Sequence, residues 1–99
     1  MNELSDRILR ITRIYLGPAS EIFLKRQASG HMNGLDFEQI KPEHLQTFFR
    51  WIHSSSKLII KDKADLLLHA LTSAFKNHLP EGDAQTEKEI LSAETDYIK

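Results

Sequence analysis

Residues 62–79, DKADLLLHALTSAFKNHL, carry the clearest helical pattern in the chain. Their apolar side chains recur at steps of three or four residues, so a helix with about 3.6 residues per turn places them on one face. Asp62 suits the N-cap, where its carboxylate accepts a hydrogen bond from the first turn. Pro80 and Gly82 follow the stretch and are expected to end the helix. The predicted buried stripe is Ala64, Leu67, Leu68, Leu71, Phe75 and Leu79.

The same periodicity continues upstream in residues 42–60, which predict another helix with proline at its first position. A run of three serines weakens helix propensity, so the end of this helix is expected between Ser54 and Ile60. Its predicted stripe is Leu45, Phe48, Phe49, Ile52 and either Ser56 or Ile59. The preceding residues 35–40 are too few for a stable helix, and we expect a single turn there. That turn is expected to insert one or more of Leu35, Phe37 and Ile40 into the core.

A third helical pattern covers residues 2–16, with Asn2 or Ser5 as its N-cap. Its predicted stripe is Leu4, Ile8, Ile11 and Tyr15, with Ile14 beside it. Gly17-Pro18 ends this helix, since glycine tolerates left-handed geometry and proline lacks the N–H that would continue it. Proline also suits the first position of a new helix, expected over residues 18–29. This helix is expected to bury Ala19, Ile22 and Phe23.

Residues 30–34, Gly-His-Met-Asn-Gly, show no periodicity and predict a loop. No segment shows the strict alternation of a half-buried strand. The sequence therefore predicts an all-α fold, a four-to-five-helix orthogonal or irregular bundle, formed by a single domain over residues 1–80. Residues 81–99 are expected to form a C-terminal tail that is either a short helix or disordered.

Charge divides the chain into two parts. Residues 1–80 hold 11 basic and 8 acidic side chains, for a net +3, whereas residues 81–99 hold 2 and 6, for a net −4. The body is thus mildly basic and the tail acidic.

Bulk composition favours an ordinary globular protein. The chain has 99 residues, 40% of them hydrophobic and 27% charged, and no cysteine. Disulfides, thiolate metal sites and cysteine nucleophiles are therefore excluded. The longest apolar runs have only three residues, against about 18 for a membrane span. We expect a soluble, cytoplasmic protein that does not bind membranes.

The chemically active side chains do not form a recognisable constellation. His44 and His53 are nine residues apart, as are His69 and His78, and this spacing places each pair on opposite sides of a helix. The four glycines occur in turn contexts rather than in a phosphate-binding loop. We expect no metal site, no cofactor and no enzymatic activity.

Trp51 is the best candidate for a partner contact. It lies about 100° from the stripe of its predicted helix, so it is an exposed anchor for a partner, the edge of a wide buried face, or a contact with the first predicted helix. Arg50 and His53 flank it and are expected to form a polar rim around such an interface. Leu66 likewise lies beside the apolar stripe of the helix predicted over residues 62–79, which already has enough large side chains to form the buried face. The sequence predicts that an exposed patch containing Trp51 or Leu66 binds a protein partner or a second copy of the chain.

Weak nucleic-acid binding is the alternative. A basic scatter runs through the first two predicted helices and consists of Arg7, Arg10, Arg13, Lys25 and Arg26. Nucleic-acid-binding domains usually concentrate such residues and have a pI above about 9, whereas the pI here is near 6.5. Nucleic acid is therefore the less expected partner.

The run Arg13-Ile14-Tyr15-Leu16-Gly17-Pro18-Ala19, followed by a helix that contains Leu24-Lys25-Arg26, resembles a motif of small helical modules in bacterial signalling proteins. In those modules one helix ends in Tyr-(Leu/Ile)-Gly-Pro and the next begins on the proline, often at the C-terminus of kinases or response regulators. We expect this chain to carry the motif without a kinase or receiver domain. The resemblance implies a regulatory module of bacterial signalling and brings no catalytic residues.

Overall fold

The computed structural model describes residues 1–79, and these residues form four α-helices without any strand. The helices are α1 (Glu3–Leu16), α2 (Ser20–His31), α3 (Leu45–Ile60) and α4 (Lys63–Ala74). Short 3₁₀ turns occupy Gly17–Ala19, Phe37–Gln39, Pro42–His44 and Lys76–His78. The predicted all-α fold is confirmed. The expected acidic tail, residues 81–99, lies outside the described residues. Pro80 and Gly82, which were expected to end the last helix, lie outside them as well.

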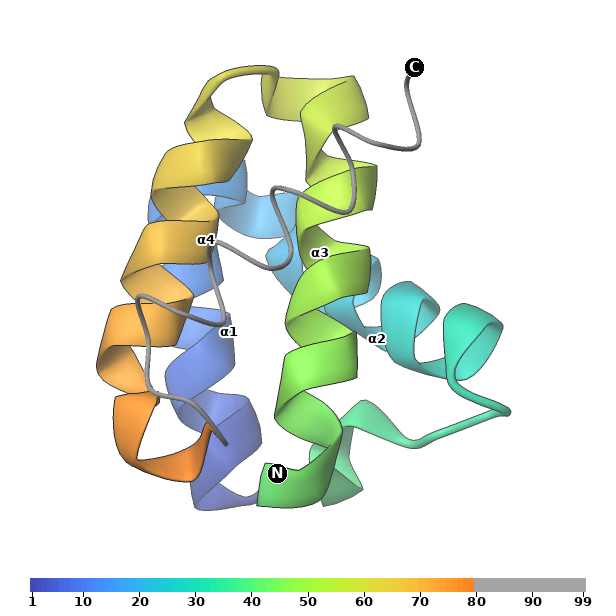
Figure 1. Ribbon diagram of the computed structural model, residues 1–99. Coiled ribbons are helices and arrows are strands. Elements are labelled where there is room, and N and C mark those ends of the chain that lie inside the picture. The colour runs from blue at the N-terminus through green and yellow to red at the C-terminus, as the bar shows by residue number, and fades with distance from the viewer. Residues whose placement is uncertain (80–99) are drawn as a thin grey trace, which may run out of the picture.

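α4 lies beside both α1 and α3, and α2 crosses behind α3 (Figure 1). Arg7 near the start of α1 reaches the end of α4, where its guanidinium donates to the Ala74 carbonyl at 2.9 Å and lies 4.5 Å from the Phe75 ring centre. α1 and α4 are therefore antiparallel. α3 and α4 form a hairpin through Lys61 and Asp62.

The C-terminal half of the domain follows the predicted pattern. All six stripe residues of the stretch 62–79 are buried. In α3 the buried residues include Leu45, Phe48, Phe49, Ile52 and Ser56, and the helix ends at Ile60. Ile59 remains 61% exposed, so Ser56 rather than Ile59 continues the stripe. Each fully buried Phe or Leu contributes about 1.5–3 kcal/mol through removal of apolar surface from water.

The expected inward faces of α1 and α2 are partly wrong. Ile8 is buried as predicted, but Ile14 is 77% and Ile22 is 61% exposed. Ala19 is exposed as well. For α2 the cause is the 3₁₀ turn Gly17–Ala19, which delays the start of α2 to Ser20 and rotates its inward face. That face consists of Ser20, Leu24, Gln27 and Ala28.

The helix ends show one confirmed cap and one incorrect one. The Asn2 side chain accepts from the Ser5 N–H at 2.8 Å and donates to the Ile40 carbonyl at 2.8 Å, so it caps α1 and ties it to the linker. In that linker Phe37 and Ile40 are buried, as expected. Asp62 occupies the N-cap position of α4, but its side chain makes no capping hydrogen bond. Its backbone is helical, and this geometry does not aim the carboxylate at the first-turn N–H groups.

α4 ends at Ala74, before the expected boundary, and the turn Lys76–His78 follows it. Within residues 1–79, none of the helices combines the length and the apolar character that crossing a membrane requires.

Candidate partner-binding site

Trp51 is half-buried and stacks on the ring of His31, the last residue of α2. The ring centroids are 4.0 Å apart and the planes differ by 6°. The contact is therefore with the second helix and not with the first, which was the contact considered from the sequence. Farther along the same side of α3, the Ser55 hydroxyl donates to the Gln27 side-chain oxygen at 2.7 Å. α2 is thus antiparallel to α3, and the end of α2 at His31 lies beside Trp51.

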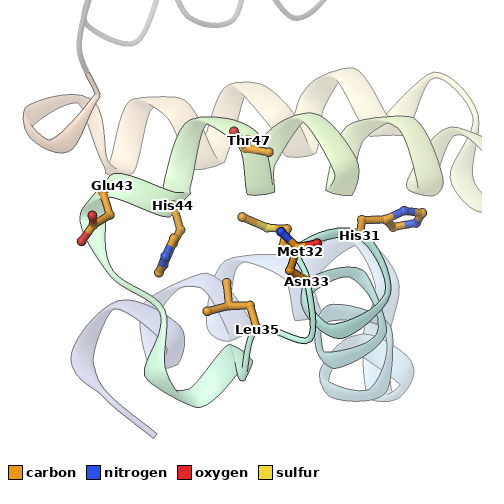
Figure 2. Close-up of a pocket in the computed structure, with 7 residues that line it drawn as sticks. All are labelled: His31, Met32, Asn33, Leu35, Glu43, His44 and Thr47. Atoms are coloured by element: carbon orange, nitrogen blue, oxygen red, sulfur yellow. The ribbon is translucent and has the colours of Figure 1, made fainter.

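Next to this aromatic pair is an open hollow of about 340 Å³ between the end of α2 and the start of α3 (Figure 2). It is lined by His31, Met32, Asn33, Leu35, Glu43, His44 and Thr47. The side chains of Met32, Leu35 and His44 point toward one another across it. Met32 and Leu35 also pack against the core, so the apolar part of the hollow rests on a fixed base.

His44 is held in one orientation at this hollow. Its Nδ1 accepts a hydrogen bond from the Lys41 backbone N–H at 3.0 Å, across the turn that starts α3. Because Nδ1 accepts, the neutral ring carries its proton on Nε2. The hollow therefore combines an apolar base with a fixed imidazole, the Thr47 hydroxyl and the Glu43 carboxylate at its margin. Such a composition suits an apolar side chain surrounded by polar contacts.

The expected polar rim of Trp51 does not include His53, because this side chain has no exposed surface. Arg50 is exposed, and its role in a rim stays a prediction. The His53 Nε2 lies 2.7 Å from the Asp65 carboxylate and joins α3 to α4. The reason is helical geometry, because two residues correspond to about 200° and direct His53 away from Trp51. His53 therefore belongs to the core.

Leu66 is 58% exposed, as expected, but it lies on α4. α4 packs on the His53 side of α3, whereas Trp51 faces α2 on the other side. The structure does not bring Leu66 and Trp51 into one surface.

Most of the candidate nucleic-acid residues are engaged within the protein. Arg7 is bound to Ala74 and Phe75, and Arg10 pairs with Asp6 at 2.9 Å. Lys25 pairs with Glu21 at 3.0 Å, and this hydrogen bond and charge raise the pKa of Lys25. Arg13 and Arg26 are exposed. Nothing in this arrangement favours nucleic-acid binding over the protein-binding alternative.

Four of the five histidines within residues 1–79 lie in separate environments. His31 stacks on Trp51, His44 caps a turn, His53 is in the core and His78 lies 6.3 Å from the Phe75 ring. Among residues 1–79, no group of three or more His, Asp or Glu residues is arranged to hold a metal ion.

Comparison with protein-family models, curated proteins and solved structures gave no match to this chain. The sequence pointed to Trp51 and missed the hollow, although one signal was available. His44, Thr47 and Trp51 are separated by three and four residues and so share a side of one helix.

Proposed function

We propose that this domain is a non-enzymatic, cytoplasmic protein-binding module that uses the hollow and the His31–Trp51 pair as its binding surface. We call this the Trp51 surface, and it comprises Trp51, Arg50 and the residues that line the hollow. The observation that carries the proposal is the half-buried indole, stacked on His31, beside a hollow with an apolar base. Tryptophan and arginine are enriched among the residues that dominate binding energies at protein interfaces.

The proposed binding mode is insertion of one apolar side chain of the partner between Met32 and Leu35. The partner backbone then lies against Trp51 and Arg50, with His44 and Thr47 available for hydrogen bonds. The Tyr-Leu-Gly-Pro motif supports a role in bacterial signalling, and a kinase or response regulator is the partner class that it suggests.

Photo-crosslinking tests the proposal. A photoreactive phenylalanine at Thr47, an exposed position in the hollow, is expected to capture one or a few discrete proteins in the cell of origin. The same group at Arg10, an exposed α1 position outside the hollow, provides the control. Mass spectrometry identifies the captured chains. The proposal fails if Thr47 captures nothing, or if it captures the same set as Arg10.

A further inference from the structure

One end of the bundle collects exposed apolar side chains. Because α1 and α4 are antiparallel and α3 leads directly into α4, the α1–α2 corner and the α3–α4 corner lie at the same end (Figure 1). We define residues 13–26 and 57–66 as the corner end. Six large apolar side chains of the described chain are exposed, and the corner end contains five of them: Ile14, Ile22, Leu58, Ile59 and Leu66. The exposed fraction of Leu58 reaches 88%.

Such a concentration is unusual for a surface that contacts only water. Each of the five side chains lies in the helical turn next to one of the two corners. None of them belongs to the hydrophobic core, which is formed by other residues of the same helices.

The corner end also carries most of the net charge of the domain. Lys25 is left out of this count because its Nζ lies 3.7 Å from Glu38, which pairs with the N-terminus at the opposite end. The corner end then holds five basic and three acidic side chains, for a net +2, whereas the rest of residues 1–79 holds six basic and five acidic. Two of its three acidic residues already have partners, since Glu21 pairs with Lys25 and Asp65 with His53. Lys61 and Lys63 are exposed beside the apolar group. The occupant of this end should be apolar and acidic at once.

The C-terminal segment of the same chain has both properties. Residues 81–99 carry a net charge of −4 and four large apolar side chains, which occur as two pairs seven residues apart: Ile90 and Leu91, then Tyr97 and Ile98. Glu87, Glu89, Glu94 and Asp96 surround these pairs. Both the charge and the apolar side chains of the segment thus complement those of the corner end.

The chain is long enough for the contact. Leu79 lies at the opposite end, where Asn77, His78 and Leu79 line a hollow with Pro42, Glu43 and Gln46 at the start of α3. α3 has 16 residues and spans about 24 Å at about 1.5 Å per residue. The eleven residues from Leu79 to Ile90 reach up to about 36 Å when extended.

From this complementarity we infer that residues 81–99 bind the corner end of their own chain and cover its apolar side chains. The link is intramolecular, so a weak contact is favoured by the high effective concentration of a tethered segment. The segment then competes with any acidic protein or anionic surface for the corner end. This contact is separate from the Trp51 surface, because Trp51 faces α2 in the middle of α3.

Paramagnetic relaxation enhancement in the full-length protein tests the inference. The chain has no cysteine, so Ser92→Cys provides a single attachment site for a nitroxide. Methyl signals of Ile14, Leu58 and Leu66 are expected to broaden several times more than those of Met1 and Leu35. Broadening that is no stronger at the corner end overturns the inference.

Two further samples identify the source of the contact. A mixture of isotope-labelled chains and spin-labelled chains without isotope should show no broadening, and broadening there assigns the contact to a second copy and overturns the inference. In the same Ser92→Cys protein, Ile90→Asp with Leu91→Asp should abolish the enhancement. The matched change Ala84→Asp with Gln85→Asp adds the same charge without removing a large apolar side chain and should retain it. Equal enhancement in both double variants contradicts the proposed apolar contact.

Discussion

His53 shows how strongly a single buried side chain depends on its partner. Its ring has no exposed surface, and Nε2 lies 2.7 Å from Asp65, which is itself 52% exposed. Because a carboxylate only accepts hydrogen bonds, the imidazole donates from Nε2. The sequence placed His53 on an interface rim because it lies close to Trp51 in sequence. The opposite orientation follows from the helical angle, but only the position of α4 shows that the His53 side of α3 is buried as well.

Replacing Asp65 should therefore destabilise the domain more than replacing its neighbour Asp62. Asp65→Ala is expected to lower the free energy of unfolding by about 1–2 kcal/mol, because a buried polar ring loses its acceptor. Asp62→Ala should change it by less than about 0.5 kcal/mol, since the Asp62 side chain makes no capping hydrogen bond and is exposed. Both carboxylates lie at the start of α4, so helix-dipole effects are matched. Urea denaturation checks the pair, and equal losses would contradict the assigned role of Asp65.

At the scale of the elements, the Gly17-Pro18 corner decides how α1 passes into α2. Gly17 has φ +66 and ψ −146, a conformation that side chains disfavour, and its N–H bonds to the Arg13 carbonyl. The sequence predicted that a helix ends here, and it does. The 3₁₀ turn that follows was not predictable from periodicity, because a shift of two residues in a helix start leaves the apolar spacing unchanged. That turn explains why Leu24 and Ala28, rather than Ile22, face the core.

Two glycine substitutions isolate this backbone requirement. A Cβ at Gly17 or at Gly30 meets no atom within 4 Å, so neither change introduces a clash. Gly17→Ala is expected to lower the free energy of unfolding by about 1–3 kcal/mol, because alanine must adopt a strained conformation. Gly30→Ala lies within α2 and should raise it by about 0.5–1 kcal/mol through helix propensity. The account of the corner is wrong if Gly17→Ala is as stable as the wild type in urea denaturation.

At the scale of the whole molecule, α3 and α4 were predictable almost residue by residue, since their stripes are long and regular. The hollow was not, because it forms only when the end of α2 and the turn before α3 come together. Residues 30–34 were assigned to a loop, whereas α2 continues through His31 and the ring of that residue meets Trp51. Such contacts depend on the path of the loop and on the placement of the helices, and neither can be read from the local spacing of apolar residues. Trp51 and Leu66, equivalent candidates by sequence, therefore lie on different surfaces.

Because Trp51 and Leu66 lie on different surfaces, the proposed binding site can be tested by the yield of the Thr47 photo-crosslink in two single variants. Trp51→Ala is expected to reduce the yield about tenfold or more, because truncation of a central aromatic anchor typically costs at least about 2 kcal/mol of binding energy. Leu66→Ala should leave it unchanged. Trp51 lies outside the buried core cluster, and circular dichroism checks that both variants remain folded. An unchanged yield in Trp51→Ala, or a loss confined to Leu66→Ala, would contradict the assignment of the Trp51 surface as the partner-binding site.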